Sequence, residues 1–181
     1  MSSPFRHTPA LLVAFLAAAG ITVLAGGVSA RVAPDFSGRW ATEPATGGRG
    51  AAGDMGSGWG SPITITQDTA RLTVEYAFFG RGDMQPPMKF IYALDGSETK
   101  NSVMMGRGVQ AQTSKTAWDG ERLVITTLHT FADPASGKPQ NTEVKQTLSL
   151  ESPAVLIVDT LRAGVMGGPA TVTKTTYRKQ S

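Results

Sequence analysis

The chain has 181 residues, of which 21 are glycine, 11 are proline and none is cysteine. Without cysteine it has no disulfide framework and no thiolate metal site. The 17 Lys and Arg residues nearly balance the 14 Asp and Glu residues, so a nucleic acid is not an expected partner. With only two histidines, most acid–base and metal-binding constellations are excluded, and we expect no cofactor and no bound metal.

Residues 1–30 have the organisation of a secretory signal peptide. Ser2 to His7 is short and polar, Ala10 to Ala25 is almost entirely apolar, and Val28 to Ala30 offers small residues for cleavage. An uncleaved anchor is the alternative, because the apolar segment approaches the roughly 17 to 25 residues that span a bilayer. We expect cleavage, and therefore a periplasmic or extracellular protein with no stable membrane span and a mature domain of residues 31–181.

The mature domain is predicted to consist of strands and turns. Apolar and polar residues alternate with a period of two, which is typical of half-buried strands. In the segment Met88 to Leu94, for example, Phe90 and Tyr92 share one face. The predicted strands are Phe36–Thr42, Ile63–Gln67, Leu72–Phe78, Met88–Leu94, Val109–Trp118, Leu123–Phe131, Thr142–Leu150, Val155–Arg162 and Thr171–Arg178.

The turns between these strands predict how they pair. The clearest hairpin signal is Asp119-Gly120, because this dipeptide readily adopts the positive φ angles of a tight turn. Short turns favour antiparallel pairing, since a parallel crossover needs a dozen or more residues. A meander this long either exposes two edges or closes on itself. With no helix predicted to cover an edge, the sequence predicts an all-β fold, a single antiparallel up-and-down β-barrel of about eight to ten strands.

Three short motifs resemble lipocalins and the related fatty-acid-binding proteins. Phe36 to Trp40 is similar to the G-x-W opening strand of lipocalins, Trp118 to Ile125 looks like a hairpin of the fatty-acid-binding proteins, and Thr175 to Lys179 looks like their last strand. The whole pattern resembles the small secreted lipocalin-like barrels of bacteria. Two features depart from it: a Gly-rich segment replaces the helical lid, and Thr175 stands where the family carries an Arg for a ligand carboxylate.

The resemblance assigns a structural role to Trp40. In lipocalins the equivalent ring plugs the closed end of the barrel, and an Arg stacks on it. We therefore expect Trp40 to be buried with its N–H satisfied locally, and Arg178, or alternatively Arg162, to stack on its ring.

The segment 47–60 is rich in glycine and contains Met55 and Trp59. It lacks the following helix and lysine that a phosphate-binding loop requires. We predict a mobile loop over one mouth of the barrel, in which Met55 and Trp59 are candidate lid residues.

His129 is the histidine of the mature domain, and it shares a strand face with Leu123, Ile125 and Thr127. Catalysis would require a partner, and Asp159 is the best candidate from the strand pattern. A single strand histidine is more often a hydrogen-bonded core or rim residue, so we expect no catalytic residues and no enzymatic activity.

The strand faces suggest a ligand-binding interior. The face that carries Gln110 to Trp118 combines neutral polar residues with a tryptophan, but the pattern leaves open whether it points inward or outward. We expect a non-enzymatic binding protein for a small apolar or amphipathic molecule. A packed barrel that engages another protein or the cell envelope, or a barrel-cavity isomerase or cyclase, are the alternatives, and the oligomeric state is left open. The candidate lining residues are Tyr76, Phe78, Phe90, Tyr92, Trp118, His129 and Tyr177.

Overall fold

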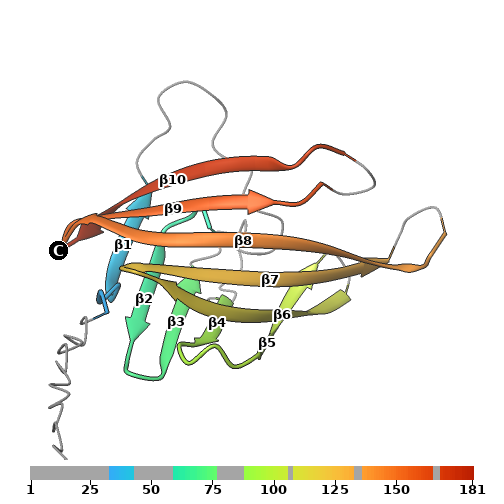
Figure 1. Cartoon of the computed structure of the whole chain (residues 1–181), viewed down its shortest axis with the longest axis horizontal. Coiled ribbons are helices and arrows are strands. Elements are labelled where there is room, and N and C mark those ends of the chain that lie inside the picture. The colour runs from blue at the N-terminus through green and yellow to red at the C-terminus, as the bar shows by residue number, and fades with distance from the viewer. Residues whose placement is uncertain (1–32, 43–58, 77–87, 106–107, 133–135, 165–167) are drawn as a thin grey trace, which may run out of the picture. The chain divides into compact units, whose positions relative to one another are not determined.

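The structure is a computed structural model that describes residues 33–42, 59–76, 88–105, 108–132, 136–164 and 168–181. These residues form ten strands (Figure 1). Within the described ranges no helix is long and apolar enough to cross a membrane. The strands are β1 (Gly38–Thr42), β2 (Ile63–Gln67), β3 (Arg71–Tyr76), β4 (Met88–Ala93), β5 (Thr99–Met105), β6 (Gly108–Asp119), β7 (Arg122–Ala132), β8 (Pro139–Ser152), β9 (Val155–Arg162) and β10 (Thr171–Gln180).

All ten strands belong to one antiparallel sheet, in the order β4-β3-β2-β1-β10-β9-β8-β7-β6-β5. Strands that follow one another in sequence pair with each other, except that β4 does not pair with β5, and β1 also pairs with β10. In Figure 1 the long strands β6 to β10 run across the view, and the short strands β2 to β4 cross them at a steep angle. The sheet curls into a nearly closed barrel, which confirms the predicted all-β fold and is compatible with a lipocalin-like fold.

The barrel is closed by side chains where its two edge strands, β4 and β5, come together. The Asn101 side chain on β5 accepts a hydrogen bond from the Ile91 N–H at 2.8 Å and donates one to the Ile91 carbonyl at 3.0 Å. Thr116 on β6 donates to the carbonyl of Ala93 on β4. Asn101 therefore satisfies the same two main-chain groups that a neighbouring strand would satisfy.

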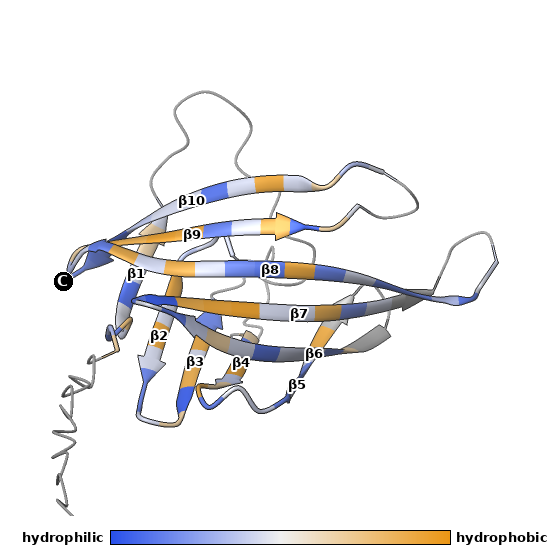
Figure 2. Ribbon diagram, viewed as in Figure 1, coloured by the Kyte–Doolittle hydropathy of each residue, from blue (hydrophilic) through white to orange (hydrophobic). Residues whose placement is uncertain are grey.

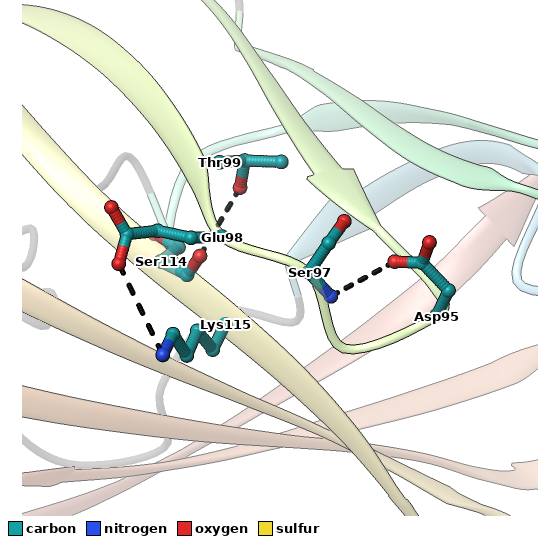
Figure 3. A network of polar contacts seen from close by, with 6 residues as sticks. All are labelled: Asp95, Ser97, Glu98, Thr99, Ser114 and Lys115. Carbon is teal, nitrogen blue, oxygen red and sulfur yellow. Dashed lines mark hydrogen bonds and ion pairs between the residues drawn. The ribbon is translucent and has the colours of Figure 1, made fainter.

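The connection from β4 to β5 contains a short turn and is bound to β6 at its β5 end (Figure 3). The Asp95 carboxylate accepts a hydrogen bond from the Ser97 N–H at 2.9 Å, which forms a short turn. Thr99 donates to the carbonyl of Ser114 at 3.3 Å, and Glu98 lies 4.0 Å from the ammonium group of Lys115. The contacts of Thr99 and Glu98 hold the connection against β6, beside the seam between the edge strands.

The core lies inside the barrel, because alternate residues of each strand point inward. Figure 2 shows hydrophobic residues alternating with polar ones along the long strands. The predicted faces are confirmed: Leu72, Val74 and Tyr76 are buried on β3, and Phe90 and Tyr92 are buried on β4. The same alternation carries Leu123 and Ile125 of β7 and Leu156 and Val158 of β9 into one hydrophobic core.

One of the ten strands was not predicted from the sequence. β5 (Thr99–Met105) was not among the predicted strands, because the segment shows no clean alternation of apolar and polar residues. On its inward face Val103 is fully buried, but the next inward residue is the polar Asn101, which is also buried. A polar residue at an inward position hides the period of two on which strand prediction depends.

Trp40 is buried and its indole N–H donates to the Phe36 carbonyl at 3.0 Å, as predicted. The predicted partner of its ring is wrong by one residue. The cation over the ring is Lys179, whose ammonium nitrogen lies 5.4 Å from the ring centroid. Register explains the difference, since Trp40 is directly opposite Lys179, whereas Arg178 is opposite Ala41 and points to the other face of the sheet.

Candidate binding site on the inner face of the barrel

An aromatic cluster covers the inner side of β3 and β4. The Tyr76 ring meets the Phe90 ring edge to face, with centroids 5.2 Å apart, and meets the Trp59 ring in the same way at 6.0 Å. Tyr92 is buried beside them. The structure therefore brings together four of the predicted lining and lid residues, and their rings fill this side of the barrel by contacting one another.

The polar atoms of this cluster are removed from water. Burial raises the pKa of Tyr76 and of Tyr92 well above the usual range of a tyrosine. Trp59 and Tyr76 lie near enough to the Tyr92 hydroxyl to oppose this shift in its pKa. The Trp59 indole N–H and the Tyr76 hydroxyl nevertheless make no hydrogen bond of normal geometry to any described residue.

Tyr177 on β10 lies at the border of the cluster. Its hydroxyl accepts a hydrogen bond from the Gly60 N–H at 2.6 Å, which fixes the residue after Trp59 to the last strand. Burial is the main cause that raises the pKa of Tyr177, to about 12, and the Gly60 hydrogen bond opposes it. Tyr177 thus anchors the end of the Gly-rich segment, of which residues 47–58, with Met55, lie outside the described residues.

A second group of inward side chains is polar. It lies on β6 to β9 and is called here the inner polar patch. The alternation that buries Leu123 and Ile125 on β7 continues into polar residues along the same face, and neighbouring strands do likewise. This answers the question that the sequence left open, because the polar face of β6 points inward. The patch consists of Gln112, Ser114, Thr127, His129, Gln146 and Thr160, each no more than 8% exposed.

The register of the strands arranges this patch in cross-strand pairs. Gln112 is directly opposite His129, and Ser114 is directly opposite Thr127. The hydroxyl oxygens of Ser114 and Thr127 are hydrogen-bonded at 2.8 Å. On the next strands, Gln146 is directly opposite Thr160. Neither Gln146 nor Thr160 was among the predicted site residues, because strand alternation shows which residues share a face but not that this face points inward.

His129 is the candidate residue with the most distinctive surroundings. It is 8% exposed, and its Nε2 atom is buried without a hydrogen-bond partner among the described residues. Burial lowers the pKa of the imidazole, which favours its neutral form. The possible partner Asp159 is exposed and lies on the outer face of β9, on the other side of the sheet. In the structure, the side chains of His129 and Asp159 therefore lie on opposite faces of the sheet and do not meet.

The other predicted residues are placed as follows. Trp118 lies near the C-terminal end of β6, away from Gln112, and it stacks on Phe36 with ring centroids 6.2 Å apart and planes 10° apart. Phe78 lies outside the described residues. Arg162 on β9 is directly opposite Val144, so it extends from the inward face at the margin of the patch, where burial lowers its pKa.

The described residues contain no group of three or more His, Asp or Glu side chains that could hold a metal ion. The chemistry that the patch offers is neutral hydrogen bonding, from hydroxyl, carboxamide and imidazole groups. Comparison of the sequence with protein-family models and with curated proteins finds no match.

Proposed function

We propose that this protein is an exported, non-enzymatic, lipocalin-like barrel that binds a small amphipathic molecule inside it. The observation that carries the proposal is the inner polar patch, and above all the buried Nε2 atom of His129, which has no partner among the described residues. Apolar residues at one end of the inner face and polar residues farther along it match a molecule with an apolar part and a polar part.

The energetic argument concerns what a barrel interior normally contains. A buried polar group without a hydrogen bond costs about 1 to 3 kcal/mol. A barrel selected for stability alone would fill the positions of Gln112, His129 and Gln146 with aliphatic side chains, as it does at Leu123, Ile125 and Leu148. A bound molecule that offers a hydrogen bond to the Nε2 atom of His129 would supply the stabilisation that this buried nitrogen does not obtain from the described residues.

A packed barrel with a structural or interaction role is the second candidate, and the aromatic cluster favours it. The Tyr76 ring packs against both the Trp59 ring and the Phe90 ring, so on this side of the barrel the aromatic rings pack against other protein side chains. The two candidates differ in what lies against the polar patch, which is a bound molecule in the first and only protein or water in the second.

Native mass spectrometry of the protein purified from the organism that encodes it tests the proposal. We expect a mass excess of a few hundred daltons that disappears when the protein is unfolded, extracted with solvent and refolded. A sample whose native mass equals that of the mature chain would favour the packed barrel.

Export is a separate part of the proposal, since it depends only on residues 1–30. Cell fractionation combined with N-terminal sequencing tests it. We expect the protein outside the cytoplasm with its N-terminus near Arg31. A protein that begins at residue 1 or 2 and sediments with membranes would instead indicate an uncleaved anchor.

A further inference from the structure

Four residues of the inner polar patch form a compact square on β6 and β7, called here the grid: Gln112, Ser114, Thr127 and His129. Gln112 faces His129 across the two strands, and Ser114 faces Thr127 one step along them. Directly opposite residues of an antiparallel pair have Cβ atoms about 4.5 to 5.5 Å apart. The grid therefore gathers a carboxamide, an imidazole and two hydroxyls on one small area of the inner face.

The grid has more hydrogen-bonding capacity than its own contacts use. In the bond between Ser114 and Thr127, 2.8 Å long, one hydroxyl donates and the other keeps its proton for a further acceptor. The Nε2 atom of His129 is buried and has no partner among the described residues. A ligand group placed over the grid would meet both donors and acceptors.

The grid is uncharged, and so are its neighbours. Burial lowers the pKa of His129, which keeps the imidazole neutral at neutral pH. A charged head group brought against neutral side chains would lose its hydration without gaining an opposite charge. The positions directly opposite the grid on either side are Thr99 and Asn101 on β5 and Thr142 and Val144 on β8.

We infer that the grid is a subsite for an uncharged polar group of the ligand, such as a hydroxyl, a carbonyl or a carboxamide. The apolar part of the same molecule would lie toward the apolar residues farther along β7 and β8, among them Ile125 and Leu148. The inference rests on the proposed binding function and adds the chemical class of the ligand's polar end.

Four probes with the same ten-carbon chain test this inference: 1-decanol, decanamide, decanoate and decylamine. Binding is measured at pH 7.5 by isothermal titration calorimetry, below the concentration at which each probe forms micelles. We expect the two neutral probes to bind about tenfold more tightly than the two charged ones, which corresponds to the net contribution of one hydrogen bond.

Two grid variants locate the polar end of the probe. His129→Phe keeps a planar ring but removes both nitrogens, and Thr127→Val removes one hydroxyl. Each is expected to weaken the binding of decanamide by about tenfold. Thr126→Val is the matched control, because Thr126 is the neighbouring residue on β7 and points to the outer face. It should bind all four probes as the wild type does. Thr127→Val keeps the test decisive if His129→Phe does not fold.

The outcomes separate the two proposals. If no probe binds, the proposed binding function itself is contradicted. If the probes bind but the charged ones bind as tightly as the neutral ones, or if both grid variants bind decanamide as the wild type does, the inference is overturned and the binding function stands. Preferential binding of decanoate that is lost in Arg162→Met would overturn it as well, and would place the polar end of the ligand at the inward arginine of β9.

Discussion

At the scale of single residues, His129 makes the stability of the folded domain sensitive to pH near neutrality. Histidine is the side chain whose ordinary pKa lies between pH 5 and 8. Burial lowers the pKa of His129, and the residues directly opposite it, Gln112 and Thr142, are uncharged. No neighbouring carboxylate on the adjacent strands at this level stabilises the protonated ring, so protonation must oppose folding.

We therefore predict that the protein loses stability as the pH falls from about 7.5 to about 5. The unfolded chain protonates His129 near its ordinary pKa of about 6.5, while the folded chain resists protonation, so the free energy of unfolding rises with pH in this window. Urea unfolding at a series of pH values measures the slope, and His129→Phe should flatten it.

The carboxylates in the turns titrate at lower pH, so they do not cause the predicted change in stability between pH 5 and 7.5. Hydrogen bonds from neighbouring residues lower the pKa of Asp35, Asp68 and Asp95, so their stabilising contribution is lost only as the pH falls below about 4. An identical slope between pH 5 and 7.5 in the wild type and in His129→Phe would contradict the assignment to His129.

The contacts of Trp40 show which properties of a single residue a local sequence pattern can predict. The burial of Trp40 and a local partner for its indole N–H were expected from the resemblance to lipocalins, and the partner is the carbonyl of Phe36, four residues earlier in the chain. The cation on its ring was not predicted, because Lys179 reaches Trp40 only through the register between β1 and β10. A shift of one residue in that register exchanges the two faces of β10, and the sequence of either strand alone does not specify it.

Among the elements, β1 is a short strand that joins the two halves of the sheet. It has five residues and joins β2 on one side to β10 on the other. Its inward residue Trp40 is 1% exposed, accepts the Lys179 ammonium over its ring and donates to Phe36. A strand this short depends on the packing of a single large side chain.

We predict that Trp40→Ala is the costliest truncation in the barrel. Loss of a buried tryptophan removes its transfer free energy and leaves a cavity, which costs about 3 to 5 kcal/mol of stability. Thermal unfolding followed by circular dichroism measures the effect, with Lys179→Met as the comparison for the cation alone, which should cost about 0.5 to 1 kcal/mol. A melting temperature of Trp40→Ala within a degree or two of the wild type would show that the ring does not secure the strand.

Most of the nine predicted strands were found from their apolar residues, and β9 is an example, with predicted and observed bounds that coincide at Val155–Arg162. β6 was predicted although its inward face is polar, because the Asp119-Gly120 turn marks the hairpin that it forms with β7. β5 was missed because Asn101 occupies an inward position, and Asn101 is there to bond with β4. Asn101 thus both interrupts the alternation by which β5 could have been predicted and helps to close the barrel. Its role depends on Ile91 of β4, which the sequence of β5 alone does not reveal.

For the molecule as a whole, stability depends on the seam between β4 and β5. The sheet order ends at these two strands, so their facing edges are not joined by a ladder of main-chain hydrogen bonds. Asn101 and Thr116 reach across instead, from β5 and β6 to the main chain of β4.

We predict that Asn101→Leu destabilises the protein by about 1 to 3 kcal/mol, because two hydrogen bonds are lost and the Ile91 main chain is left without them. Urea unfolding gives the free energy, and hydrogen exchange should show faster exchange of the Ile91 amide. Ser102→Ala, at the exposed neighbouring position of β5, is the control and should stay within about 0.5 kcal/mol of the wild type. Unchanged protection of the Ile91 amide in Asn101→Leu would mean that other contacts hold the seam.

The candidate site was also predictable only in part, because its position depends on how the strands come together in the barrel. Strand alternation placed His129 and Thr127 on one face, but whether the face of Gln112 and Ser114 points inward depends on the direction in which the sheet curls. Curvature is a property of the closed barrel and is not encoded in any one strand. The sequence therefore predicted which residues share a face, and the structure determined which face is the interior.

The pairing of β1 with β10 has a further consequence for how the chain is threaded. Arg39 lies opposite Gln180, so the two ends of the barrel sequence meet within the sheet, while the edges of the sheet are linked by the short connection between β4 and β5. A circular permutant that begins at β5 and ends at β4, with residues 181 and 33 joined by a linker, would keep every strand ladder. In that order β1 would follow β10 directly, and the break in the polypeptide would coincide with the break in the sheet.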